Sequence, residues 1–103
     1  MNNVEKFIAR LEKIKKIVFK KHFYERAEER PISEYLVKEQ IKKTQNILNV
    51  EEQKSLKKEK KFKIWIKLSN KYSLVLIVSI SKKTLYIITG WNTNRKWQKE
   101  IQK

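Results

Sequence analysis

Hydrophobic and polar residues alternate along three runs in the second half of the chain, and this alternation predicts three β-strands. In the first run, residues 61–68, apolar side chains fall on one face, while three lysines and a tryptophan fall on the other. The second run, residues 72–80, is apolar on both faces, as expected of a central strand. The third run, residues 84–92, contains the single glycine, Gly90. Connections of two to three residues predict that neighbouring strands pair antiparallel.

Apolar residues at three- and four-residue spacing predict helices in the first half of the chain. Residues 4–16 carry one apolar stripe and a basic opposite face. Such a helix can lie on a membrane surface or cover a sheet, and the apolar side of the predicted sheet favours the second. Residues 22–29 can form a short helix that ends before Pro31. Ser33 is a good N-cap for a further helix that begins at Glu34.

The remaining segments are short or polar. Residues 17–20 and 46–50 are candidates for edge strands, and residues 51–60 form a Lys-rich stretch that we expect to be an exposed loop. In the tail, residues 93–103, Trp97 and Ile101 stand four apart, which indicates a helical turn docking on the body. Trp91 and Trp97 bracket an arginine, and they either stack on a ligand or fill the core and seal the tail.

Together these elements predict one α+β domain over residues 1–103. A small antiparallel sheet of three to four strands would carry two to three helices on one face. Residues 1–50 would form the mainly helical part, residues 61–92 the β-meander and residues 93–103 the tail. The side of the sheet that carries the lysines would be left for a ligand.

The charge changes this picture, because it indicates an anionic partner. The formal net charge is +15, with +4 in residues 1–51 and +11 in residues 52–103. Such a field favours a polyanion, whether a nucleic acid, an acidic protein or an anionic membrane surface. Adaptation to high temperature also enriches lysine and glutamate, but it predicts glutamates to match the lysines, and the second half has no such match.

Other residue types narrow the function classes. The chain has no cysteine and one histidine, which argues against disulfides, thiol chemistry and a structural zinc site, so we expect no cofactor and no metal. No apolar run approaches 20 residues and no signal-peptide pattern is present at the N-terminus. We therefore expect a cytoplasmic protein without a membrane partner.

One candidate for chemistry is the set His22, Arg26 and Arg30, which stand at i, i+4 and i+8. On a helix these positions share one flank, because each step of four residues turns by only about 40°. An imidazole can take or give a proton near neutral pH, and guanidinium groups grip phosphate oxygens. The set therefore suits phosphate chemistry. The alternative is structural: the arginines pair with nearby glutamates and the histidine packs.

The segment KKHFYERAEERPISEYLVKEQI resembles the opening of a family of small proteins related to the BrnT toxins and, more distantly, to the RelE/ParE toxin superfamily. The segment YIITGWNTNRKW at the end of the predicted meander is similar as well, so the resemblance covers most of residues 18–95. It implies a RelE-like fold with helices against one face of a small antiparallel sheet. It further implies a toxin that cleaves RNA without metal, through attack of the RNA's own 2′-hydroxyl on the adjacent phosphate.

By motif, the resemblance assigns catalysis to His22, Arg26 and Arg30, and by general analogy it adds Lys63 and Arg95. The chain departs from several nucleases of the superfamily in having one histidine. If that histidine were buried, proton transfer would fall to a lysine or tyrosine. The implied partners are RNA, either free mRNA or mRNA on the ribosome, and an acidic antitoxin protein.

Aromatic residues among lysines indicate contact with unpaired bases, because bases stack on the rings while lysines hold the backbone. The candidates for RNA binding are Lys61, Trp65, Lys67, Tyr72 and Lys96. Two further functions remain open beside the toxin. One is a non-enzymatic nucleic-acid-binding protein, architectural or regulatory, and the other is an inactive toxin-like domain that docks an acidic protein.

Overall fold

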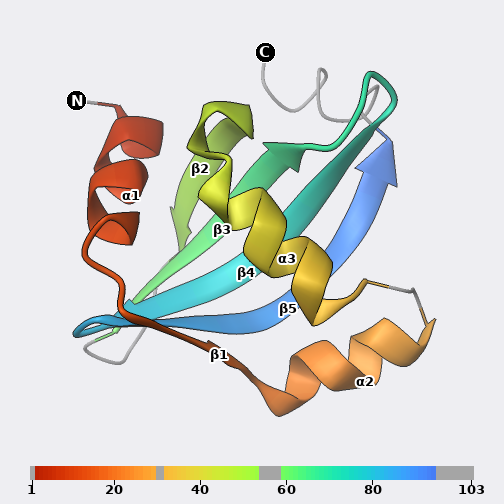
Figure 1. Cartoon of the computed structure of the whole chain (residues 1–103), viewed down its shortest axis with the longest axis horizontal. Coiled ribbons are helices and arrows are strands. Elements are labelled where there is room, and N and C mark those ends of the chain that lie inside the picture. Colours follow the sequence, from red (N-terminus) through yellow and green to blue (C-terminus); the bar gives the residue numbers. More distant parts are fainter. Residues whose placement is uncertain (1, 30–31, 54–58, 95–103) are drawn as a thin grey trace.

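The computed structural model describes residues 2–29, 32–53 and 59–94, and in this part the chain folds as a mixed β-sheet with three α-helices. The elements are α1 (Asn3–Leu11), β1 (Lys16–Phe19), α2 (Lys21–Glu29), α3 (Glu34–Lys42), the 3-10 helix η1 (Thr44–Asn46), β2 (Ile47–Gln53), β3 (Lys60–Lys67), β4 (Tyr72–Ser81) and β5 (Thr84–Asn94). Figure 1 shows α3 lying across one face of the sheet, α1 beside β2, and α2 beyond the end of β1.

The three predicted strands form the antiparallel meander β3–β4–β5. Lys67 of β3 lies opposite Ser73 of β4, and Ser81 of β4 lies opposite Thr84 of β5, so the second hairpin has a two-residue turn. β4 is the central strand of the sheet, in agreement with its apolar residues on both faces. The predicted class, α+β with a β-meander, is thus confirmed.

The strand number and the purely antiparallel pairing were wrong. The sheet has five strands in the order β1-β5-β4-β3-β2, and β1 pairs parallel to β5. Both added strands overlap the short candidates for edge strands, and both lie at an edge. β2 continues to Gln53, so the first three residues of the stretch expected to be a loop belong to a strand. A parallel pair needs a long connection between its strands. Here the whole chain from α2 to the end of β4 provides that connection, and β1 therefore lies at the edge beside β5.

Local signals in the sequence explain where the helices begin. The Asn2 side chain accepts a hydrogen bond of 2.8 Å from the Glu5 backbone N–H and caps α1, and Ser33 caps α3 as predicted, accepting 3.0 Å from the Leu36 N–H. Helix α1 ends at Leu11, earlier than the predicted residue 16, because the following residues turn to enter β1. No helix in the described ranges is both long and apolar enough to span a membrane.

The main hydrophobic core lies between the helices and one face of the sheet. Each helix contributes buried side chains to it: Phe7 from α1, Phe23 from α2, and Val37 and Ile41 from α3. The sheet contributes the apolar positions of each strand, which include Phe62, Ile64, Ile66, Leu74, Leu76, Val78, Leu85 and Ile87. The opposite face of the sheet is therefore the one on which these helices do not pack.

Candidate nucleic-acid interface

The lysines of β3 share the face of the sheet opposite the helices. Lys61, Lys63 and Lys67 alternate with the buried residues of the same strand, and side chains alternate across a strand, so all three point away from the main core. Each is partly exposed. The surface of the sheet that carries these three residues is called the lysine face below.

Lys63 lies between two tryptophans on this face. Its Nζ is 5.0 Å from the ring centroid of Trp65 and 5.6 Å from that of Trp91. Both rings share its face because Trp65 pairs with Val75 and Val75 pairs with Trp91 across neighbouring strands. A lysine within about 6 Å of an aromatic face is held by the ring quadrupole at roughly 0.5–2 kcal/mol. The two contacts thus fix the position of one ammonium group.

The expected role of Trp65 in stacking on bases was wrong. Trp65 is on the lysine side of β3, as the alternation predicted, but only 2% of its surface is exposed. Its cross-strand neighbour Val75 is 1% exposed, and neither residue belongs to the main core cluster. The indole therefore packs in a small second group on the lysine face, where it supports Lys63 and is not accessible to a base.

Two residues that the sequence did not single out extend this face towards β1. Tyr86 of β5 pairs with Ser79, which pairs with Lys61, so Tyr86 shares the face of Lys61. Lys20, just after β1, places its Nζ 4.7 Å from the centroid of the Tyr86 ring. A lysine beside a half-buried ring thus recurs at a second point. The alternation of β5 in the sequence could have placed Tyr86 on one face of the sheet. It could not have placed Lys20 beside Tyr86, because that contact depends on the pairing of β1 with β5.

Two carboxylates of the described residues lie on or beside the lysine face, but neither is within ion-pair distance of its lysines. Glu51 lies opposite Lys63 in the register, and Glu59 accepts a hydrogen bond of 3.5 Å from Ser79 Oγ. Neither forms an ion pair within 4.0 Å of a described lysine, since the only such pairs in residues 2–29, 32–53 and 59–94 join Glu25 to Lys21 and to His22. The ammonium groups of Lys61, Lys63 and Lys67 are therefore not engaged in close ion pairs with described residues and can contact a polyanion.

His22 lies near the start of α2 with 59% of its side chain exposed, so its imidazole is accessible to solvent. Its Nδ1 is 3.8 Å from Glu25 Oε2 one turn further on. The helix is anchored by Phe23, whose ring is 4.8 Å from that of Phe19 in the core. Tyr24 donates a hydrogen bond to Glu34 of α3, and this bond raises the pKa of the Tyr24 hydroxyl.

The other predicted site residues have different outcomes. Arg26 lies in α2, one turn after His22, while Arg30, Arg95 and Lys96 lie outside the described residues, as does Trp97. Tyr72 is 51% exposed, but it alternates with Ser73, which pairs with Lys67, so it belongs to the side of the sheet opposite the lysine face.

The structure places His22 and Lys63 at a distance across the sheet. β4 and β5 lie between β3 and β1, and neighbouring strands are about 4.8 Å apart, so about 14 Å separate the strand of Lys63 from the strand that leads into α2. Along the strand direction, Lys63 lies close to the end of β1. Lys63 pairs with Ile77 and Ile77 pairs with Thr89, which is two residues beyond Ile87, the partner of the last residue of β1. A ligand that contacts both must therefore be extended and cross β4 and β5.

No three His, Asp or Glu side chains of the described residues are grouped so that they could hold a metal ion. Comparison of the chain with known protein families, with curated proteins and with solved structures finds no match.

Proposed function

We propose that this protein binds single-stranded RNA on the lysine face and cleaves it, as a metal-independent endoribonuclease toxin with a RelE-like fold. The observation that carries the proposal is the Lys63 ammonium held between Trp65 and Trp91 on a face with no ion-paired lysine among the described residues. A fixed cation on a sheet that has no close ion pair with a described residue is suited to a backbone phosphate. The resemblance of residues 18–95 to toxins related to BrnT supplies the reaction.

In the proposed reaction the 2′-oxygen of one nucleotide attacks the adjacent phosphorus, and the bond to the 5′-oxygen of the next nucleotide breaks. His22 is the candidate for the proton transfer, because its imidazole is exposed to solvent near the start of α2, the helix that follows β1. The cations at Arg26 and Arg30 would stabilise the charge on the phosphorus oxygens. The products are a 2′,3′-cyclic phosphate and a 5′-hydroxyl, and no redox partner is needed.

A toxin of this kind would act in the cytoplasm and would be held inactive by an acidic antitoxin protein. An acidic antitoxin segment lying across the lysine face would block access to RNA, since carboxylates would occupy the positions of the phosphates. The lysines of the lysine face form no close ion pair with a described residue, and they support this arrangement as well as they support RNA binding.

A second candidate is a nucleic-acid-binding protein without catalysis. It is favoured by the separation of His22 from Lys63, which spans two strands, and by the pairing of His22 with Glu25. In this case the lysine face acts alone, and α2 contributes only to the fold. The two candidates differ in whether bound RNA is cut.

Cleavage of a labelled RNA in the presence of a chelator tests the choice, with the product ends identified by their cyclic phosphate and 5′-hydroxyl. We expect cleavage by the wild type and its loss in the His22→Ala/Arg26→Ala variant. Lys21→Ala is the matched control, because Lys21 is the neighbouring residue of α2 and also contacts Glu25. Binding without cleavage by all three proteins would favour the second candidate. Cleavage that persists in the double variant would remove His22 and Arg26 from the catalytic site.

A further inference from the structure

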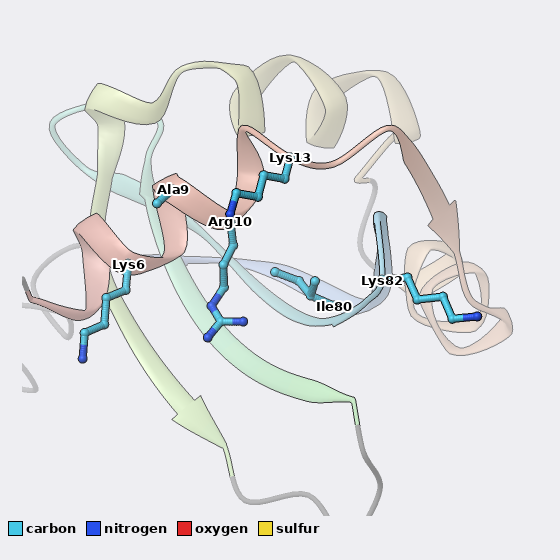
Figure 2. Close-up of a pocket in the computed structure, with 6 residues that line it drawn as sticks. All are labelled: Lys6, Ala9, Arg10, Lys13, Ile80 and Lys82. Atoms are coloured by element: carbon cyan, nitrogen blue, oxygen red, sulfur yellow. The ribbon is translucent and has the colours of Figure 1, made fainter.

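A second group of cations lies on the helix side of the sheet, where α1 approaches the turn between β4 and β5. This group lines a hollow of about 430 Å³, shown in Figure 2 and called the basic hollow below. Its lining residues are Lys6, Ala9, Arg10, Lys13, Ile80 and Lys82. Four of the six are cationic and none is acidic. The basic hollow is separate from the lysine face, since Ile80 belongs to the main core on the other side of the sheet.

Arg10 is held in position by the core beneath it. Its guanidinium carbon is 5.8 Å from the centroid of the Phe62 ring, and Phe62 packs edge-on against Phe7 at 5.3 Å. Figure 2 shows the guanidinium extending away from α1 beside Ile80, with Lys6 on the same helix. Because Phe7 and Phe62 are both buried, the support for the guanidinium is rigid. A fixed planar fork of donors matches the oxygens of a phosphate.

The basic hollow continues into a neighbouring one of about 630 Å³, which shares Lys13 and Lys82 and adds Lys15, Lys83 and Glu12. The two sides of this track are held together, because Lys15 N–H donates a hydrogen bond of 2.8 Å to the Lys83 carbonyl. None of its cations forms an ion pair within 4.0 Å with a described residue. An elongated track with one carboxylate suits an extended polyanion better than a single phosphate.

The turn between β4 and β5 contributes Lys82 and Lys83 to this track. Lys82 has a φ of 56°, and it is the only residue other than glycine with a positive φ in the described part of the chain. This backbone region favours glycine, because a Cβ is crowded there. A two-residue hairpin turn calls for a positive φ at a central residue, so the turn geometry accounts for this conformation. Lys82 occupies that position and adds a fourth cation to the lining of the basic hollow.

We propose that the basic hollow and its continuation bind the phosphate backbone of a single-stranded nucleic acid, as a site additional to the lysine face. This inference shares its ligand class with the proposed function, but it concerns different residues and can stand without cleavage. An acidic protein is the less suitable occupant, because protein interfaces centre on buried apolar or aromatic anchors. The exposed large hydrophobic side chains of the described residues, Tyr24, Tyr35 and Tyr72, lie on α2, α3 and the start of β4.

The test is a binding titration with a fluorescent 2′-O-methyl uridine 15-mer, which cannot be cleaved by 2′-hydroxyl attack, over a range of salt concentrations. The test variant is Lys6→Gln/Arg10→Gln/Lys13→Gln. The matched control removes three exposed charges from and just after α3: Lys38→Gln/Lys42→Gln/Lys43→Gln. Each phosphate contact on a single strand contributes about 0.7 to the slope of log K against log salt. We expect the test variant to bind roughly tenfold or more weakly, with a slope smaller by about 2.

Three comparisons interpret the result. Equal affinities and slopes for the test and control variants would overturn the inference. Competition by a poly-glutamate 15-mer as effective as unlabelled 15-mer would also overturn it in favour of an acidic protein. A third variant, Lys61→Gln/Lys63→Gln/Lys67→Gln, reports on the lysine face alone. If this third variant binds the 15-mer normally while the test variant does not, the basic hollow is a binding site and the proposed RNA site on the lysine face is contradicted.

If removal of Arg10 from its place over Phe62 unfolds the protein, as circular dichroism would show, Lys6→Gln/Lys13→Gln/Lys82→Gln replaces the test variant. This variant leaves the contact between Arg10 and Phe62 intact. It should lower the slope by a similar amount, and an unchanged slope would again contradict the inference.

Discussion

At the scale of single residues, the one glycine is required by space and not by backbone conformation. A Cβ at position 90 would lie 2.6 Å from Leu76 Cδ2 and 3.2 Å from the Val75 carbonyl oxygen, while φ of Gly90 is not positive. Leu76 is fully buried and cannot move aside easily. Gly90 therefore leaves room for the side chain of Leu76, its partner on β4, on the core face of the sheet.

Gly90→Ala should lower the free energy of unfolding by about 1–3 kcal/mol, as overpacking of a core does. Urea denaturation measures this change. The control is a double-mutant cycle with Leu76→Ala, which removes the atom that the new methyl group would meet. The two substitutions together should destabilise by less than the sum of their separate effects. An additive result would show that the clash with Leu76 is not the cause.

A second residue carries strain in place of a glycine. Lys82→Gly should raise the free energy of unfolding by about 1 kcal/mol, because a positive φ is unfavourable for a residue with a Cβ. The same substitution should weaken binding of single-stranded nucleic acid, since it removes a cation from the basic hollow. Lys83→Gly in the same turn is the control, and it should destabilise, because Lys83 has no positive φ to relieve. Denaturation and anisotropy measure the two effects, and a destabilised Lys82→Gly variant would contradict the first.

At the scale of elements, α2 is joined to α3 by the Tyr24–Glu34 hydrogen bond in addition to its contact with the core through Phe23. That bond raises the pKa of Tyr24, so folding favours the protonated phenol. Its contribution to stability is then fully present below the ordinary tyrosine pKa of about 10, and it is lost as the pH rises through the folded-state value.

Tyr24→Phe should therefore be less stable than the wild type at neutral pH, and the difference should begin to shrink as the pH rises above about 10. Chemical denaturation of both proteins between pH 7 and 11 measures it. Tyr35→Phe is the control, because Tyr35 is an exposed tyrosine on α3 whose hydroxyl has no hydrogen-bond partner among the described residues. A difference that grows with pH would contradict the assigned bond.

Within β3, Lys63 has two separable contributions, which are packing between Trp65 and Trp91 and charge on the lysine face. Lys63→Met keeps an unbranched apolar chain between the rings but removes the charge. It should destabilise by no more than about 1 kcal/mol, the size of a partly exposed cation–π contact. Affinity for single-stranded RNA should fall several-fold more than in Lys71→Met, which removes a charge from the turn before β4. Equal affinities of the two variants would mean that Lys63 is structural.

At the scale of the whole molecule, the sequence predicted what depends on neighbours along the chain. Alternation through Phe62, Ile64 and Ile66 located β3 and its two faces, and Ser33 located the start of α3. Contacts between distant segments could not be predicted in the same way. β1, the parallel partner of β5, is only four residues long. Its pairing depends on the edge of β5, which lies far away in the sequence.

The same limit applies to the candidate sites. Alternation placed Trp65 on the lysine side, but its burial depends on Val75 and on the row of side chains across three strands. The basic hollow combines α1 with a turn some seventy residues later in the chain, and no spacing within either segment indicates that they meet. Charge asymmetry predicted an anionic partner, but it favoured the second half of the chain, whereas three of the four cations of the hollow come from the first.

The two basic surfaces make a joint prediction about the length of the ligand. The lysine face and the basic hollow lie on opposite sides of the sheet, but both reach the end of the sheet where β3 begins. Lys61 of the lysine face pairs with Ser79, and the next residue of β4, Ile80, lines the basic hollow. A strand of nucleic acid that passes around this edge can contact both, while a strand of a few nucleotides can contact only one. The slope of log K against log salt should therefore be steeper for the 15-mer than for a 4-mer by about 0.7 for each added phosphate contact. The variant Lys6→Gln/Arg10→Gln/Lys13→Gln should lose this dependence on length while it still binds the 4-mer on the lysine face. If the wild type shows equal slopes for both lengths, the two surfaces do not act on the same strand.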